Sequence, residues 1–107
     1  MSYQKLVRDK IPEIIKNNNE TPITIILSDE EYKKELEKKL LEEYQEVIEA
    51  TGQDRLEELA DMLEIITYLA QLENATLTDI MTIAKSKKEK NGGFDKKIYL
   101  ENVLSNK

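Results

Sequence analysis

The sequence contains no cysteine, histidine or tryptophan, and it has only three glycines and two prolines among 107 residues. The absence of cysteine excludes disulfides, thiolate nucleophiles and zinc–thiolate sites. Because histidine is missing as well, a bound metal would be a hard cation held by oxygen ligands, such as Mg²⁺. The scarcity of glycine and proline, in a chain rich in Glu, Lys and Leu, favours helices.

Long hydrophobic runs are also missing. No apolar stretch approaches the roughly 18–20 residues that span a membrane, and no signal-peptide pattern stands at the first residues. We therefore expect a cytoplasmic protein without a membrane partner. The net charge of −6 argues against binding to a nucleic acid polymer, although a local basic patch could hold phosphates. Since the charges alternate with periodic apolar residues, we expect one ordered domain over residues 1–107.

The apolar residues recur with the period of a helix, which predicts an all-α fold, an antiparallel helical bundle. Ser28 and Glu31 have the spacing of a capping box at the start of a long helix over about residues 29–50. A second long helix is expected over about residues 54–73. It is apolar over an unusually wide arc, which predicts neighbours on two of its sides.

Shorter elements are expected around these two helices. Pro12 suits the first turn of a short helix that the asparagines at 17–19 end, and Thr76 begins a fourth helix that closes at a Gly-Gly pair. The β-branched run at 21–27 predicts either one short strand, with residues 97–103 as its partner, or an extended linker.

Each long helix carries an acidic cluster, and helical direction sorts its members. At about 100° per residue, Glu43 lies within the apolar stripe of the first long helix and Glu46 lies at its edge. Glu58 and Asp61 lie within the apolar arc of the second, whereas Glu42 points further out. Antiparallel packing of the two helices could bring these two pairs opposite each other.

Four carboxylates gathered within a few ångströms repel one another and cannot all stay ionised without a compensating cation. One or two Mg²⁺ ions, with Mn²⁺ as a substitute, would supply that compensation. The alternative is that the acids lie on solvated faces and pair with the lysines of the first long helix, Lys33, Lys34, Lys38 and Lys39. We favour the metal site because Glu43 and Glu58 both fall among apolar positions.

Two groups of basic residues could contact the phosphates of a ligand. Lys87 and Lys88 follow the apolar stripe of the fourth helix, where they could reach a phosphate or simply lie in solvent near the helix C-terminus. Near the N-terminus, Arg8, with Lys10 close by, could hold a phosphate bidentately or pair with an acid.

The motifs EEYQE (Glu42–Glu46) and ELAD (Glu58–Asp61) resemble those of the all-α nucleoside triphosphate pyrophosphohydrolases, the MazG-like superfamily. The opening KLVRDKIPEII and the late GGF resemble its short-chain branch, often labelled phosphoribosyl-ATP pyrophosphohydrolase-like. The likeness covers nearly the whole chain. It implies Mg²⁺-dependent hydrolysis of a nucleotide between its α- and β-phosphates, which gives a monophosphate and pyrophosphate.

The resemblance also implies roles by motif position. Four residues would be the metal ligands: Glu43, Glu46, Glu58 and Asp61. Glu42 would be a further ligand or the group that orients water, and Lys87 and Lys90 would contact phosphates. Asn91 stands where the family pattern has a basic residue.

The residue types favour the same chemistry. Since no histidine or cysteine is present, the nucleophile is most simply water activated by the metal, with catalytic roles for Glu42 and Glu43. The substrate could be a non-standard nucleotide, or phosphoribosyl-ATP in histidine biosynthesis. A further alternative is a non-catalytic helical interaction module whose acids bind a basic partner. The wide apolar arc over Leu56–Leu72 favours a homodimer or homotetramer.

Overall fold

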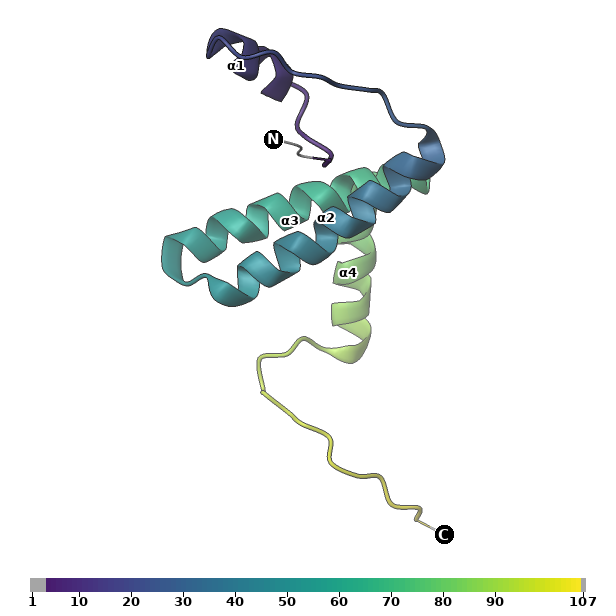
Figure 1. Cartoon of the computed structure of the whole chain (residues 1–107). Helices are drawn as coiled ribbons and strands as arrows, with labels where there is room; N and C mark the ends of the chain where they lie inside the picture. Colours follow the sequence, from purple (N-terminus) through teal and green to yellow (C-terminus); the bar gives the residue numbers. More distant parts are fainter. Residues whose placement is uncertain (1–3, 107) are drawn as a thin grey trace.

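The computed structural model describes residues 4–106 and places four helices in this part of the chain (Figure 1). They are α1 (Ile11–Asn17), α2 (Asp29–Glu49), α3 (Gly52–Leu72) and α4 (Leu77–Asn91). No strand occurs between residues 4 and 106, so the predicted all-α class is confirmed.

Side-chain caps begin α2 and α4. The Ser28 hydroxyl accepts a hydrogen bond from the Glu31 amide at 3.2 Å, and the Glu31 carboxylate accepts one from the Ser28 amide. Thr76 and Asp79 form the same reciprocal pair at α4. Each box satisfies amides that the first helical turn leaves without partners, and both predicted starts are confirmed.

The pair α2–α3 is the body of the molecule. The two helices run antiparallel and lie side by side, joined by a short turn (Figure 1). Gly52 has φ +60°, a backbone conformation that glycine adopts without a Cβ penalty. Because this glycine completes the reversal, α3 begins at Gly52 rather than at the predicted Asp54.

Two apolar segments lie outside the helices. Residues 21–27 form the extended linker between α1 and α2, so the strand alternative is wrong (Figure 1). Ile23 and Ile26 are 95% and 97% exposed, and no second strand lies beside them in residues 4–106. Residues 97–103, the expected partner, belong to a C-terminal segment that runs away from the helices (Figure 1).

The single chain buries little apolar surface. Among residues 4–106, the buried hydrophobic side chains are Leu36, Val47 and Ala70. The radius of gyration is 19.3 Å, whereas a compact chain of this length would have one of about 13 Å. Much of the wide apolar arc of α3 therefore faces solvent. None of the helices described is both long enough and apolar enough to cross a membrane.

Candidate metal centre

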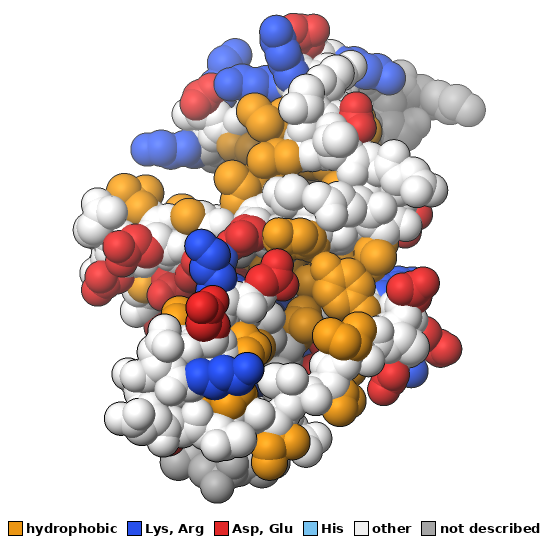
Figure 2. All heavy atoms as spheres, turned by 90° about the horizontal axis from the view of Figure 1, so that it is seen from above, with side chains coloured by type: hydrophobic (Ala, Val, Ile, Leu, Met, Phe, Trp, Pro, Cys, Tyr) orange, Lys and Arg blue, Asp and Glu red, His pale blue; other side chains and the backbone are white. Residues whose placement is uncertain are grey.

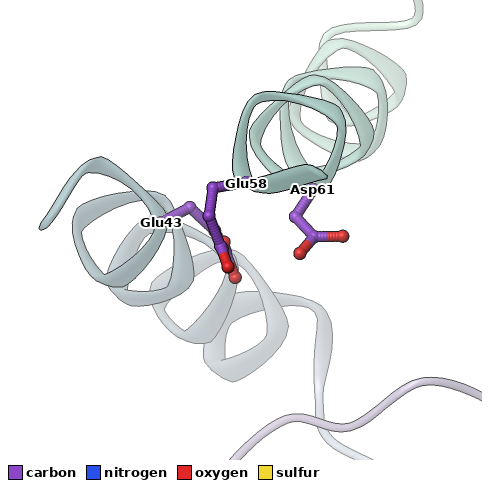
Figure 3. Close-up of side chains that lie close together, drawn as sticks. All are labelled: Glu43, Glu58 and Asp61. Atoms are coloured by element: carbon purple, nitrogen blue, oxygen red, sulfur yellow. The ribbon is translucent and has the colours of Figure 1, made fainter. Parts of the chain in front are cut away.

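Three carboxylates from α2 and α3 point to one place between the two helices (Figure 3). Glu43 projects from α2, whereas Glu58 and Asp61 project from α3. One oxygen of each side chain lies within 4.8 Å of the other two, and all three residues are half-buried. The antiparallel packing of α2 and α3 thus brings Glu43 next to Glu58.

The cluster leaves two carboxylate oxygens without a partner. Glu43 Oε2 and Glu58 Oε2 are buried, and neither accepts a hydrogen bond from residues 4–106. Such oxygens are costly because they lose water and gain no donor in exchange. Burial is the largest cause of the raised pKa of Glu43, followed by the hydrogen bonding and the charge of Glu46.

The pKa of Glu58 is raised further, to about 7. Its largest cause is hydrogen bonding with the Glu46 side chain, and burial and the Glu46 charge follow. Glu46 therefore lies beside both glutamates, on the solvent-exposed edge of the cluster. Three of the four residues expected to hold a metal are thus grouped, and Glu46 acts on two of them; with all four carboxylates ionised they would repel one another.

Arg8 approaches the cluster from the N-terminal segment. Its Nη2 lies 3.1 Å from Asp61 Oδ1, and its Nη1 pairs with Glu64. Of the two alternatives for Arg8, the structure shows the pairing with acids. Figure 2 shows acidic side chains gathered around a basic one on the face seen from above. The side chain of Arg8 is 61% exposed, so solvent screens these pairs.

Glu64 has no role in the predicted site. It is half-buried and shares Arg8 with Asp61. The spacing contained a signal for it, because Glu58, Asp61 and Glu64 follow one another at intervals of three and lie near one side of α3.

The lysines of α2 were the alternative partners for the clustered acids. Lys34 lies 4.0 Å from Glu30, and Lys39 lies 4.0 Å from Glu42. Neither lysine pairs with a residue of the cluster. Glu42 thus lies near Lys39 and does not belong to the group formed by Glu43, Glu58 and Asp61. Its role in positioning water stays a prediction.

The other predicted phosphate ligands are three lysines. Lys10 stands at the N-cap position of α1 without a capping hydrogen bond of its side chain, and Lys87 and Lys90 lie in the second half of α4, which leaves the α2–α3 pair at a steep angle (Figure 1). Within residues 4–106, none of these lysines forms an ion pair. Lys87 instead lines a shallow hollow with Phe94 at the end of α4.

Comparison with known proteins gives one partial match. A stretch of 50 residues is 46% identical to an uncharacterised protein of Mycolicibacterium smegmatis, and it covers 47% of this chain and 51% of that protein. The chain thus spans about half the length of the curated relative it matches. No protein family matches the chain. No solved structure matches it either.

Proposed function

We propose that the chain is a Mg²⁺-dependent nucleotide pyrophosphohydrolase that cleaves between the α- and β-phosphates. The observation that carries this proposal is the half-buried group of Glu43, Glu58 and Asp61, with two buried oxygens that have no donor. The motif resemblance to MazG-like enzymes supports the reaction type, and non-standard nucleotides or phosphoribosyl-ATP are the substrates to test.

The donor set fits a hard divalent cation. All the donors are carboxylate oxygens, which suit Mg²⁺ and Mn²⁺, and the chain offers neither thiolate nor imidazole for a softer metal. Glu43, Glu58 and Asp61 would hold the ion, with Glu46 at the exposed edge. A divalent cation there would favour the ionised carboxylates and so oppose the burial, the hydrogen bonding and the charge of Glu46 that raise the pKa values of Glu43 and Glu58.

In the proposed reaction, a water oxygen attacks the α-phosphorus, and the bond from that phosphorus to the bridging oxygen breaks. The electron pair of that bond leaves with pyrophosphate. The proton of the water would pass to a carboxylate, for which Glu43 is the candidate, and Glu42 would orient the water. When bound, the metal lowers the pKa of water and offsets the charge on the departing pyrophosphate.

Arg8 has a second place in this proposal. Its guanidinium neutralises Asp61 and Glu64 in the free chain. A cation held by Glu43, Glu58 and Asp61 would compete with Arg8 for Asp61, and the planar guanidinium of Arg8 would then suit a phosphate oxygen. Lys10, Lys87 and Lys90 are further candidates for phosphate contacts.

The test is pyrophosphate release with Mg²⁺ from standard, deoxy and oxidised nucleoside triphosphates and from phosphoribosyl-ATP. Glu58→Gln and Asp61→Asn should each lower turnover at least about 100-fold and leave the circular dichroism spectrum unchanged. Glu57→Gln, the same change on the neighbouring exposed residue, should keep wild-type turnover. Wild-type turnover by Glu58→Gln would disprove the assignment of the site.

Metal titration separates an enzyme from a non-catalytic helical module. Saturable binding of Mn²⁺ that raises the melting temperature, and that Asp61→Asn weakens, is expected for the enzyme. A chain indifferent to Mn²⁺ and inactive on every nucleotide would instead be a binding module for a basic partner.

A further inference from the structure

Two tyrosines lie level with each other on the α2–α3 pair, beyond the acidic cluster. The two helices run antiparallel, and Glu43 of α2 meets Glu58 of α3 in that cluster (Figures 1 and 3). Tyr32 precedes Glu43 by eleven residues, and Tyr68 follows Glu58 by ten. At a rise of about 1.5 Å per residue, both tyrosines therefore lie about 15–17 Å from the cluster, in the same direction along the pair.

Helical direction shows which way the two side chains point. At about 100° per residue, Tyr32 is within about 20° of the direction of Glu43, so it points toward α3. Tyr68 falls between the directions of Asp61 and Glu64, the two acids that pair with the N-terminal segment. Tyr32 is half-buried, whereas Tyr68 is 38% exposed. The ring of Tyr68 is therefore accessible to a ligand on the side of α3 that carries Asp61.

The N-terminal segment reaches the same place. Arg8 pairs with two acids of α3 that precede Tyr68. Asp9 follows Arg8 in the chain. Burial is the largest cause of the raised pKa of Tyr32, and the charges of Tyr68 and Asp9 add to it, so these three side chains are neighbours. Asp9 forms no ion pair with another residue between 4 and 106, and its carboxylate is exposed.

The other aromatic side chains between residues 4 and 106 lie elsewhere. Tyr44 follows Glu43 in the chain, but it is turned from it by about 100° in the sense opposite to Glu46. Phe94 and Tyr99 belong to the C-terminal segment, which runs away from the helices (Figure 1). In the described part of the chain, Tyr32 and Tyr68 are therefore the aromatic pair on the side of the candidate metal centre.

We propose that Tyr32 and Tyr68 bind the base of the nucleotide, with the ring of Tyr68 stacked on it. Tyr68 lies seven residues, about 10 Å, beyond Asp61, a distance that the sugar and 5′-phosphate of a nucleotide span. Arg8 lies between the two places, where the phosphates would pass. Stacking on a tyrosine ring selects ligands with a flat aromatic base over pyrophosphate and sugar phosphates.

Asp9 narrows the class of base. An ionised carboxylate only accepts hydrogen bonds, so it favours a base that carries an amino group over one with an oxo group at the same position. The substrates expected for this site are therefore nucleotides of amino-bearing bases. This inference rests on the proposed function, because it assigns the base of the same substrate.

Calorimetric titration with an analogue that resists hydrolysis tests the stacking. The probe is CTP with a methylene group between its α- and β-phosphates, in the presence of Mg²⁺. Tyr68→Leu should raise the dissociation constant about 10- to 100-fold, the range expected for one stacked base. Tyr68→Phe keeps the ring and should bind as the wild type does. Tyr44→Leu is the matched control, since Tyr44 is 54% exposed on α2, and it should also keep wild-type affinity.

A comparison of CTP with UTP tests the role of Asp9, because their bases differ by an amino and an oxo group at one position. The wild type should prefer CTP about tenfold in kcat/KM. Asp9→Asn should bring the two values together, because an amide both donates and accepts hydrogen bonds. Equal kcat/KM values in the wild type would overturn the preference for an amino group.

The outcomes separate the base site from the reaction. A wild type that binds the analogue and releases no pyrophosphate from any nucleotide would keep the base site and overturn the proposed hydrolysis. Unchanged affinity in Tyr68→Leu, with pyrophosphate release intact in the wild type, would overturn the base site alone. A wild type that does not bind the analogue would overturn both.

Discussion

In the metal-free chain, the surroundings of Glu58 disfavour the ionised form of its carboxyl group. One of its oxygens is buried without a donor, and the side chain adjoins Glu46 and Glu43. Two or more carboxylates in contact retain a proton that separate ones would lose. The cluster is therefore a place where the fold tolerates local repulsion, which is common at functional sites.

This environment makes the stability of the metal-free protein depend on pH. The pKa of Glu58 is about 7 in the folded chain against an ordinary 4.5, so the folded state holds its proton more tightly. The contribution of this bound proton to the free energy of unfolding is complete below about pH 4.5 and is lost as the pH rises through about 7. In EDTA, we therefore expect the melting temperature of Glu58→Gln to rise relative to that of the wild type as the pH increases from about 5 to about 8.

Differential scanning fluorimetry of the two proteins across this pH range measures the difference directly. Mg²⁺ should stabilise the wild type more than the variant at about pH 8, because only the wild type has the full ligand set. Glu57→Gln serves as the charge control and should follow the wild type. A melting-temperature difference that is constant over the range would rule out this account of Glu58.

At the scale of the helices, the capping side chains make the starts of α2 and α4 independent of long-range packing. Thr51 stands at the same position of α3, but its side chain makes no capping hydrogen bond. The three helices thus provide an internal comparison. Loss of a working cap removes a hydrogen bond to the first turn, whereas loss of the Thr51 hydroxyl removes none.

We expect Ser28→Ala to lower the free energy of unfolding by about 1 kcal/mol, within a range of about 0.5–2. Thr76→Ala should cost a similar amount, and Thr51→Ala close to nothing. Urea titrations followed by circular dichroism give the three values, with the slope of each transition checked for constancy. Equal losses of unfolding free energy in Ser28→Ala and Thr51→Ala would contradict the observed capping.

The features that the sequence predicts well are those encoded over a few residues. The Ser28–Glu31 box is read from four consecutive positions, and helical period alone pointed Glu43 and Glu58 inward. The contact between Arg8 and Asp61 was not specified by such a pattern, because it joins positions 53 apart through an extended linker. The linker alternative for residues 21–27 likewise depended on whether another strand lay beside it.

At the scale of the whole molecule, the open question is how so few buried side chains hold the fold. Leu36, Val47 and Ala70 are a small core for residues 4–106, while large apolar side chains of α2, α3 and the C-terminal segment remain exposed. Folding must offset the entropy of ordering about a hundred residues, of order 1–2 kcal/mol each for the backbone. A single chain with this little burial is expected to be marginally stable, and the homodimer or homotetramer expected from the sequence would bury further apolar surface.

If two copies fold as one unit, stability must depend on protein concentration by mass action. We expect the melting temperature to rise by about 2–5 °C for each tenfold increase in concentration between about 1 and 100 µM. Thermal unfolding followed by circular dichroism, in cells of different path length, covers this range. Leu63→Glu should lower the melting temperature at every concentration, because Leu63 is 47% exposed on α3 and a dimer that covers it would have to bury a carboxylate. A wild-type melting temperature that is constant over the range would show that one chain folds alone.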